Sequence, residues 1–505
     1  MLSPEKNRLL TQVGPGTPMG ELLRRYWMPI GGASELNKNP IKPIRLMGED
    51  LVLYKDQGGR FGLLDRHCPH RRADLSYGFV EETGIRCNYH GWLMDETGRC
   101  IEQPYDDIVN PHSRAKERCS TKAYPVKECA GLLWTYMGPQ PMPELPVWEP
   151  FTWENGFREV VLSDVPCNWF QCQENSCDPV HFEWMHDNWT LRLSGTAGPY
   201  AGKHLKLKFE EFDYGFIYKR VREDSDERNP YWTVGRIALW PNGFYLGNHF
   251  EWRVPVDDEN TLSVAWFFMR VPKGREPYVQ DTVPTWVSPI KDENGRWITS
   301  HVINQDIIAW VGQGPIADRS KEHIGASDLG IVMIRKRLFD DLDAIAQGRD
   351  PKAIIRNSNV ARCVELPFFQ KKESIEGIPL EDYEISLAQG APEGISPLLR
   401  PAARGAAGVR AGHGHRTITV SKRRTAIGPE SRAAVGLGRC PWLRAHWMSA
   451  PPTEAGSPRK KGPPPAPLVG NRTAAWALHK KPGGVPPCQV PRISADKPTS
   501  AFASR

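Results

Sequence analysis

Apolar and polar residues alternate along two long stretches of the chain. Between about 42 and 138, short runs such as IRLMGEDLVLYKD and GLLWTYMG are separated by Gly, Pro and Asp turns, which is typical of the strands of a small β domain. Between 203 and 272, the runs KHLKLKFEEF, GFYLGNHFEWRVP and LSVAWFFMRVP alternate in the same way. An antiparallel sheet with one covered face gives this alternation. The sequence therefore predicts two separate β regions.

Two other stretches carry helical signals. Thr17 and Pro18 suit the N-cap and the first position of a helix, which GELLRRYW would continue. The stretch 327–348 opens with Ser327 as a cap and closes with Gly348. Its apolar positions at helical spacing are Ile331, Ile334, Leu338, Leu342 and Ile345. We expect this second helix to pack on the second sheet, so the fold class is α+β.

Length and charge divide the chain into unlike parts. Its 505 residues exceed one ordinary domain. Residues 391–505 hold 19 Lys and Arg against 4 Asp and Glu, whereas 1–390 hold 46 against 55. The basic part is rich in Pro, Gly, Ala and Arg, and it has too little apolar surface to offset the entropy of ordering it. We predict a disordered tail there, and a nucleic-acid-binding arm is the less favoured alternative.

No segment of the sequence predicts export or membrane insertion. The start, MLSPEKNRLLTQVG, has no apolar run behind a basic one, and no later stretch offers about eighteen uncharged apolar residues. Eleven cysteines in a chain of this length make no dense disulfide framework. We therefore expect a cytoplasmic protein without a membrane partner, whose reduced thiols can bind metal.

Two Cys and two His lie in one short segment, CPHRRADLSYGFVEETGIRCNYHGW, residues 68–92. Its first half supplies Cys68 and His70, and its second half supplies Cys87 and His90. Zinc sites commonly use Cys-x2-Cys or His-x3-5-His pairs, whereas a Rieske [2Fe–2S] centre has two Cys on one iron and two His on the other. The spacing favours the Rieske centre and leaves a zinc clip as the alternative.

A second group of candidate ligands follows in NWFQCQENSCDPVHFEWMHDNW, residues 168–189. It contains Asp178, His181 and His186. Two His and one carboxylate on one face of a metal form the non-haem Fe(II) site that activates O₂. His181 and His186 are five residues apart, about 140° on an ideal helix, so a shared metal requires a π-type bulge or a helix end between them. We predict a broken or bulged helix here; otherwise these are two ordinary histidines near a helix end.

Both segments resemble motifs of one enzyme family. CPHRRADLSYGFVEETGIRCNYHGWLMDETGRC looks like the Rieske motif of the non-haem iron aromatic-ring-hydroxylating oxygenases, and TPMGELLRRYWMPI is similar to the opening of their phthalate and phenoxybenzoate dioxygenase branch. The second segment resembles the family's Asp-x2-His-x4-His motif preceded by Asn. The resemblance implies an oxygenase (alpha) subunit, with a small all-β Rieske domain and a catalytic domain whose antiparallel sheet is covered by helices (helix-grip type).

The resemblance and the composition together predict four parts. They are an N-terminal helical segment (1–41), the Rieske [2Fe–2S] domain (42–150), the mononuclear iron catalytic domain (151–390) and the basic tail (391–505).

For the first motif, the resemblance implies four ligands of the [2Fe–2S] cluster. The ligands are Cys68, His70, Cys87 and His90. In the second motif it assigns His181 and His186 to Fe(II) but gives Asp178 another role, as a bridge that joins His181 to the cluster-ligating His90 of a neighbouring chain. A carboxylate in that position would also fix the orientation of a ligating imidazole. Such a bridge implies a closed ring of subunits, for which the family uses a homotrimer.

The third iron ligand must be a carboxylate from elsewhere in the chain. Asp306, in QDIIAW, best matches the family's Asp near the start of a late helix. Asp318 and Asp328 are the alternatives, although Asp328 also suits a helix cap. Asn175, one helical turn before Asp178, is expected either near the iron or as a local hydrogen-bonder.

The two metal sites imply one reaction when they are taken together. The resemblance implies that O₂ is reduced at the iron with electrons from a separate flavin and iron–sulfur reductase that draws on NADH or NADPH. No GxGxxG opens a βαβ unit in this chain, so a nicotinamide site is not expected here. The substrate is expected to be a small aromatic molecule, and dihydroxylation, monohydroxylation and O-dealkylation all remain open. The alternative is a Rieske electron-transfer protein with an inactive second domain.

Overall fold

The structure is a computed structural model that describes residues 1–271 and 274–367, so the predicted tail (391–505) lies outside the described residues. Helix α1 (Pro4–Thr11) comes first and is followed by α2 (Pro18–Leu23). Thr17 caps α2, since its Oγ1 accepts a hydrogen bond from the Gly20 N–H at 3.2 Å, which confirms the predicted helix start. The helix ends at Leu23, earlier than GELLRRYW suggested, and strand β1 (Trp27–Gly32) follows.

The first β region folds into three small antiparallel sheets with the orders β1-β11-β10, β2-β3-β4-β9 and β5-β6-β7-β8. Their strands are β2 (Ile41–Leu46), β3 (Glu49–Lys55), β4 (Phe61–Asp65), β5 (Phe79–Val80), β6 (Ile85–Arg86), β7 (Leu93–Met94), β8 (Cys100–Glu102), β9 (Ala123–Tyr124), β10 (Val126–Cys129) and β11 (Leu132–Tyr136). Short helices lie between them at η1 (Ala33–Asn37), η2 (Leu75–Tyr77), α3 (Pro104–Val109) and η3 (Lys116–Arg118). The predicted small β region is confirmed, and its partner strand β1 comes from the N-terminal segment.

The second β region is one eight-stranded sheet with the order β13-β14-β15-β16-β17-β18-β12-β19. Its strands are β12 (Gly156–Val165), β13 (His204–Phe212), β14 (Gly215–Arg222), β15 (Arg236–Leu239), β16 (Gly243–Tyr245), β17 (His249–Pro255), β18 (Thr261–Arg270) and β19 (Thr285–Val287). All neighbouring strands are antiparallel except β19, which runs parallel to β12. The predicted antiparallel sheet is therefore confirmed and extended by two strands.

Both faces of this sheet are covered at its centre. Along β17, Phe250 and Trp252 point to one face, where Trp252 meets Trp134 edge-on with ring centroids 5.1 Å apart. Their neighbours on the other face are His249, Glu251 and Arg253, yet every residue of β17 is buried. The alternation in the sequence thus correctly predicted which residues lie on the polar face. That face is covered by helices, however, and not by water.

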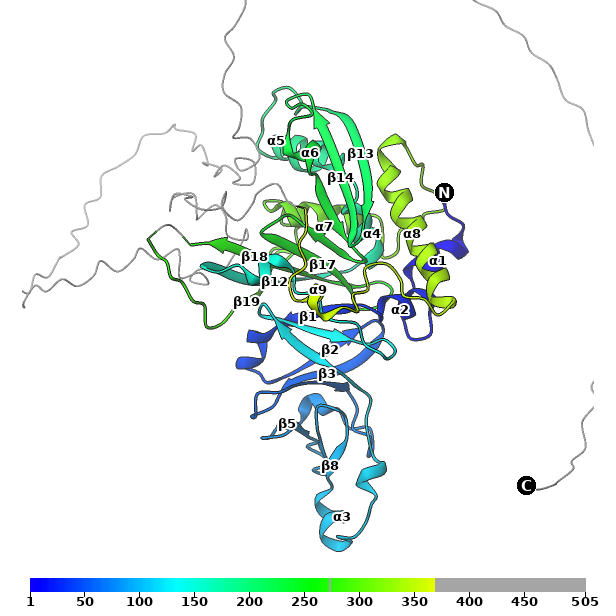
Figure 1. Ribbon diagram of the computed structural model, residues 1–505, viewed down its shortest axis with the longest axis vertical. Helices are drawn as coiled ribbons and strands as arrows, with labels where there is room; N and C mark the ends of the chain where they lie inside the picture. The colour runs from blue at the N-terminus through cyan, green and yellow to red at the C-terminus, as the bar shows by residue number, and fades with distance from the viewer. Residues whose placement is uncertain (272–273, 368–505) are drawn as a thin grey trace, which may run out of the picture. The chain divides into compact units, whose positions relative to one another are not determined.

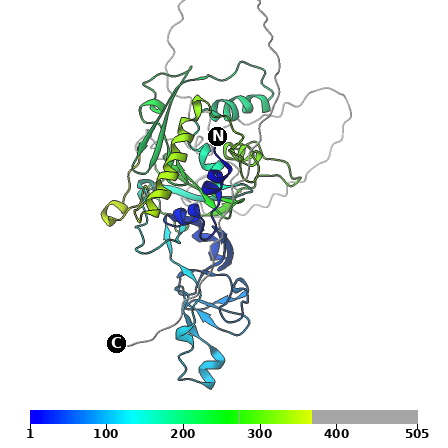
Figure 2. The same ribbon diagram turned by 90° about the vertical axis from the view of Figure 1, so that its right-hand side faces the viewer.

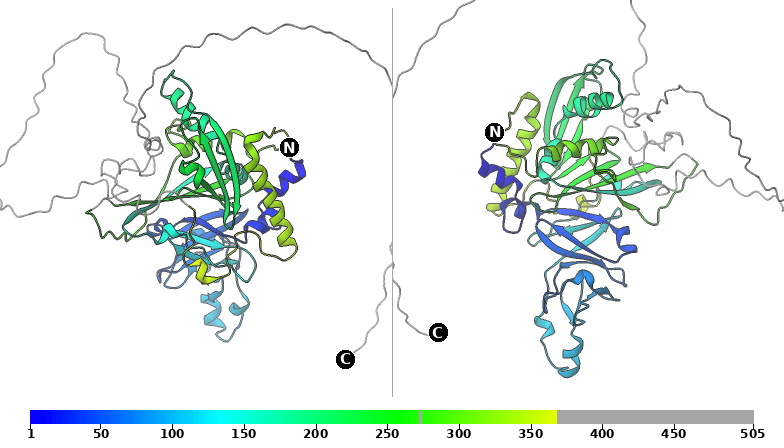
Figure 3. Two further views of the ribbon diagram at one scale, coloured as in Figure 1. Left: turned by 45° about the horizontal axis from the view of Figure 1, so that its top comes forward. Right: turned by 180° about the vertical axis from the view of Figure 1, so that it is seen from behind.

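Four helical elements cover the polar face. They are α4 (Trp169–Asn175), η5 (Phe182–Asn188), α5 (Trp189–Leu193) and α7 (Val302–Gly312). The guanidinium of Arg253 on β17 lies over the ring of Trp310 on α7 at 4.6 Å, and α4 also packs on β17. Figures 1 and 3 show α5 beside the long β13–β14 hairpin.

Helix α8 (Leu329–Ala346) confirms the predicted second helix and packs on the sheet as expected. It follows the 3₁₀ turn η6 (Ala326–Asp328), so its N-cap is Asp328 and not the predicted Ser327. Arg337 pairs with Glu211 on β13 at 2.9 Å, and Trp240 Nε1 donates to Asp341 at 2.9 Å. Figures 1 and 2 show α1 and α2 close to α8, and Lys6 of α1 lies 5.7 Å from the Phe339 ring.

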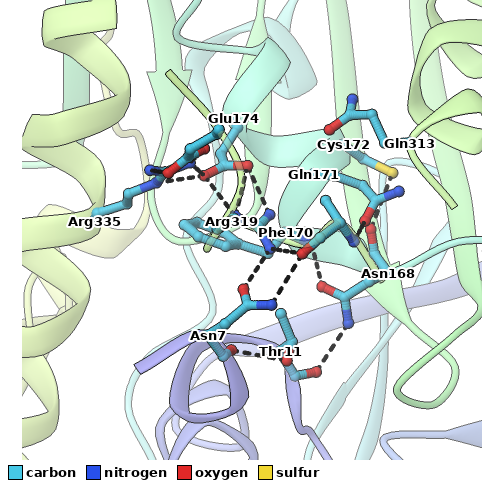
Figure 4. A network of polar contacts seen from close by, with 12 residues as sticks. Asn7, Thr11, Asn168, Phe170, Gln171, Cys172, Glu174, Gln313, Arg319 and Arg335 are labelled. Carbon is cyan, nitrogen blue, oxygen red and sulfur yellow. Dashed lines mark hydrogen bonds and ion pairs between the residues drawn. The ribbon is translucent and has the colours of Figure 1, made fainter. Parts of the chain in front are cut away.

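A buried ion-pair network fixes α4, the helix that leads into the second motif (Figure 4). Glu174 accepts from Arg319 Nη2 at 2.6 Å and from Arg335 Nε at 2.7 Å. Arg319 Nη1 also donates to Asn7 of α1 at 3.0 Å. Because removing one partner of a buried pair leaves an uncompensated charge, costing about 3–5 kcal/mol, this network holds α1, α4 and α8 in one arrangement.

The remaining elements of the described residues are short. They are η4 (Glu149–Thr152), α6 (Pro230–Thr233) and α9 (Ser358–Ala361). Within residues 1–271 and 274–367, no helix has the length and apolar character needed to cross a membrane.

Candidate metal centres

Two loops of the first β region carry the four ligands predicted for the cluster. Cys68 lies after β4 and Cys87 after β6, and their backbones are folded alike. The N–H groups of Cys68 and Cys87 donate to carbonyls five residues on, and their own carbonyls accept from the N–H four residues on. That fourth residue has a left-handed φ in both loops, 60° at Arg72 and 75° at Gly91. The two loops are therefore copies of one turn.

The paired turns bury the thiols and expose the imidazoles. Cys68 and Cys87 are 1% and 2% exposed and belong to one buried apolar cluster. His70 and His90 are exposed, and their ring centroids lie 4.5 Å apart. Partial loss of hydration and the neighbouring His90 lower the pKa of His70, which favours the neutral imidazole that a metal requires. Two inner thiols and two outer imidazoles match the division of ligands in a Rieske cluster.

The distances between the candidate ligand atoms differ between the two motifs. Among the described residues, one group of His, Cys, Asp or Glu has all its ligand atoms within 4.8 Å of one another, and it is the trio His181, His186 and Asp306. The four donors of the first motif are spread more widely than this, as expected where two irons lie between the Cys pair and the His pair.

A π-helix aligns the two histidines of the second motif. Phe182–Asn188 forms the π-helix η5, with His181 immediately before it and His186 inside it. A π-helix places residues five apart on one face, and the two imidazole centroids are 5.2 Å apart. The predicted distortion of the helix is confirmed, and it lets two histidines five residues apart face the same point.

Asp306 on α7 completes this group. Its Oδ1 lies 3.2 Å from His186 Nε2 and 3.6 Å from His181 Nε2. The His186 Nε2 atom is buried and has no hydrogen-bond partner among the described residues. Burial raises the pKa of Asp306, but His186 and His181 outweigh burial and lower it overall. A half-buried carboxylate and two imidazole nitrogens that converge without hydrogen-bonding one another fit a bound cation of the Fe(II) type.

The two alternative candidates for the third iron ligand, Asp318 and Asp328, make other contacts. Asp318 is exposed and pairs with Lys321 at 2.7 Å. Asp328 accepts from the Gly325 N–H at 2.6 Å at the start of α8. Neither lies in the group that His181 and His186 form.

Gln305 fixes the orientation of His186. Its Oε1 lies 3.0 Å from His186 Nδ1, while its Nε2 donates to the Thr299 carbonyl at 2.9 Å and to Thr190 Oγ1 at 3.1 Å. Because the Thr299 carbonyl only accepts, the amide nitrogen must face it and the amide oxygen must face His186. His186 then carries its proton on Nδ1 and turns an unprotonated Nε2 toward Asp306. Nothing in the sequence pointed to Gln305 except its place beside Asp306.

Asp178 and Asn175 lie beside the same group. Asp178 Oδ2 is 3.7 Å from His181 Nδ1, beyond a direct hydrogen bond, and its Oδ1 accepts from the Val180 N–H at 2.9 Å. Asn175 Nδ2 donates to Asp306 Oδ1 at 3.3 Å. The structure thus brings together all five residues predicted for the second site. The roles of individual residues in both sites remain predictions.

Comparison with known proteins agrees with this arrangement. The family description "Rieske [2Fe-2S] domain" matches residues 26–113, and "LigXa C-terminal domain like" matches 291–370. The chain is 59% identical over 384 residues to a 5,5'-dehydrodivanillate O-demethylase oxygenase subunit of Sphingobium sp., covering 76% of this chain and 91% of the relative. This chain belongs to the Rieske oxygenase family. Rieske oxygenase subunits of the phthalate and phenoxybenzoate branch are also similar to it.

Two of those relatives confirm the branch predicted from the sequence. The phthalate 4,5-dioxygenase oxygenase subunit of Pseudomonas putida is 33% identical, covering 69% of this chain and 88% of the relative. The phenoxybenzoate dioxygenase subunit alpha of Ectopseudomonas oleovorans is 33% identical, covering 68% and 87%. As a Rieske oxygenase alpha subunit, the protein is an enzyme that uses a [2Fe–2S] cluster, a mononuclear non-haem iron and O₂, with electrons from a separate reductase or ferredoxin.

Proposed function

We propose that this Rieske oxygenase demethylates an aryl methyl ether. The observation that carries the proposal is the largely inaccessible group of His181, His186 and Asp306, which offers three ligands to one metal. The choice of reaction rests on the relative at 59% identity, whose name describes O-demethylation of 5,5'-dehydrodivanillate. Insertion of one oxygen atom into the methyl group gives a hemiacetal, which releases formaldehyde and the phenol. The second oxygen atom leaves as water, so the reaction consumes O₂, two electrons and two protons.

The residues of the catalytic site have distinct tasks in this proposal. His181, His186 and Asp306 hold Fe(II), which when bound supplies O₂ activation. Gln305 keeps the His186 Nδ1 protonated, so that Nε2 remains a ligand. Asn175 donates to the Asp306 carboxylate and limits its rotation. Cys68, His70, Cys87 and His90 hold the cluster that stores one electron at a time. The electrons come from NADH or NADPH through the flavin of a partner reductase.

The route of that electron involves Asp178 and a second subunit. Figure 1 shows the β5–β8 sheet beyond β2 and β3 as seen from α4, and His90 near that sheet is exposed. Asp178 is also partly exposed, with 27% of its side chain accessible beside His181. We propose that Asp178 connects His181 to His90 of the partner subunit in a homotrimer, so that each cluster serves the iron of the next subunit. The cytoplasmic location remains a prediction.

Mixed oligomers test this route. Cys87→Ser removes the cluster, and Asp306→Ala removes the iron, so each variant alone should be inactive. If electrons cross between subunits, trimers reassembled from both variants should regain a substantial share of wild-type turnover. Reassembled mixtures that contain both variants, as shown by mass spectrometry, but remain inactive would contradict the proposed route.

The reaction itself is tested by product analysis. The holoenzyme, a flavin and iron–sulfur reductase, NADH and O₂ are incubated with 5,5'-dehydrodivanillate. The proposal predicts one formaldehyde per phenol formed and per NADH consumed. A cis-diol product, or NADH oxidation that yields only hydrogen peroxide, would refute O-demethylation of this compound.

A further inference from the structure

Two acidic side chains of the π-helix η5 are held by the β13–β14 hairpin. Glu183 Oε2 accepts from the backbone N–H of His204 at 2.8 Å and lies 3.0 Å from the Nδ1 atom of the same residue. Asp187 pairs with Arg222 at 2.7 Å. His204 and Arg222 are cross-strand partners, so their side chains lie next to each other on one face of the hairpin. Two neighbouring hairpin residues therefore hold two positions of one helix.

Asn188 adds further contacts between the helix and the same part of the chain. Its Nδ2 donates to the Glu183 carbonyl at 2.7 Å, and its Oδ1 accepts from the Ala201 N–H at 2.8 Å. Glu183 and Asn188 are only 5% and 3% exposed. Hydrogen bonds that are shielded from water in this way are stronger than exposed ones. The start of β13 and the residues just before it are thus firmly attached to η5.

These contacts depend on the π register of the helix. The N–H group at the end of η5 bonds to the carbonyl five residues back, and residues five apart share a face in such a helix. Glu183 and Asn188 are five apart, as are His181 and His186. In a regular α-helix the members of each pair would point about 140° apart. A change from the π to the α register would therefore break the contacts with the hairpin and separate the two histidines at the same time.

We propose that His204 and Arg222 are positioning residues that keep η5 in the π register and so turn both histidines of the second motif toward one metal. They act through Glu183 and Asp187, neither of which belongs to the group of candidate ligands. Because π-helices are rare and short, we infer that this one needs support from outside the helix. The inference rests on the proposed function only in taking the two histidines as metal ligands, and it does not depend on O-demethylation.

Cobalt binding tests this role without turnover. Co(II) replaces the mononuclear iron in the full chain with its cluster intact, and X-ray absorption at the cobalt edge counts the imidazole ligands without a contribution from cluster iron. The wild type should show two imidazoles. His204→Phe removes the Nδ1 donor to the Glu183 carboxylate, so bound cobalt should keep one imidazole, with an affinity roughly ten- to a hundredfold lower.

His204→Asn should restore the second imidazole and most of the affinity. An ionised carboxylate only accepts hydrogen bonds, so His204 donates from Nδ1, and the asparagine amide keeps an N–H donor near that position. Arg222→Met removes the contact with Asp187 and should behave like His204→Phe. It also provides the test if His204→Phe does not fold, as judged by loss of the Rieske signal.

Lys206→Gln is the matched control. It removes an exposed ion pair with Glu227 from the same strand, so cobalt binding should match the wild type. Two imidazoles at wild-type affinity in both His204→Phe and Arg222→Met, or an equal loss in Lys206→Gln, would overturn the proposal and leave the proposed function standing. Wild-type protein whose bound cobalt has no imidazole ligand would refute the metal group itself, and the proposal with it.

Discussion

The two metal-binding regions of this Rieske oxygenase are built in opposite ways. The cluster ligands lie within 23 residues of sequence, on two copies of one turn, with their imidazoles at the surface. The iron ligands come from a π-helix and a distant helix, and the 119 residues between His186 and Asp306 contain most of the large sheet. The first site is determined locally, whereas the second exists only once the catalytic domain has folded.

This difference has a consequence for function. An exposed pair of imidazoles can pass electrons to another protein or subunit, whereas a buried group of ligands can keep water away from O₂ chemistry. Because different segments form the two sites, a substitution can remove the metal of one site and leave the other site intact. The predictions below use that independence, beginning with the largest expected effect.

Asp306→Ala should remove the mononuclear iron and leave the cluster intact. The remaining two imidazoles provide too few ligands, and we expect product formation to fall by more than about a hundredfold, the upper range for loss of a supporting residue. Metal analysis together with the reduced cluster's EPR signal measures both outcomes. Asp318→Ala, an exposed carboxylate just after α7, is the control and should keep its iron. Iron retained in Asp306→Ala would shift the assignment to another carboxylate.

Asp178→Asn should keep both metals and still lose most turnover. The amide retains the size of the side chain but removes the charge that faces His181, so electron delivery between subunits should fail. We expect at least a tenfold to hundredfold loss of product formation, with iron and EPR signals unchanged. Wild-type turnover in this variant would remove Asp178 from the electron route.

Gln305→Leu should weaken iron binding by about ten- to a hundredfold, since His186 loses the acceptor that fixes its tautomer. Gln305→Glu keeps an oxygen acceptor for His186 Nδ1 and should recover part of the affinity. Iron retention during dialysis against a graded chelator gives the comparison, and the cluster signal should not change. Gln313→Leu, at the exposed C-terminal end of the same helix, should behave as the wild type; an equal loss there would point to a general effect on α7.

Gly91→Ala should affect the cluster region alone, and by the smallest amount. Gly91 has a φ of 75°, and a Cβ there would lie 3.1 Å from Pro104 Cγ. A left-handed alanine costs about 1–2 kcal/mol, so the cluster should bleach at a lower temperature while the iron content stays constant. Arg72→Gly, at the equivalent position of the other turn, relaxes the same conformation and should not lower that temperature. Loss of iron in Gly91→Ala would show that the two regions are coupled.

The cluster ligands, which depend on local sequence, were easier to predict than the iron ligands, which depend on the tertiary structure. Cys68, His70, Cys87 and His90 and the Thr17 cap depend on local spacing, so they could be recognised directly. The five-residue separation of His181 and His186 even predicted a distorted helix. Asp306 needed the resemblance to a family, because nothing near it in sequence marks it as a ligand.

Other features depended on the tertiary structure and could not be foreseen. Gln305 matters only because α7 brings it against His186. The alternation along β17 predicted which residues share a face, but not that helices cover the polar face.

The central claim is that one chain holds two independent iron sites. Anaerobic purification, iron and zinc analysis, and low-temperature EPR after dithionite reduction test it directly. The account predicts a reduced Rieske signal and about three irons per chain, two in the cluster and one in the group that includes Asp306. Zinc with no Rieske signal, or a Rieske signal with only two irons even after anaerobic loading with Fe(II), would contradict it.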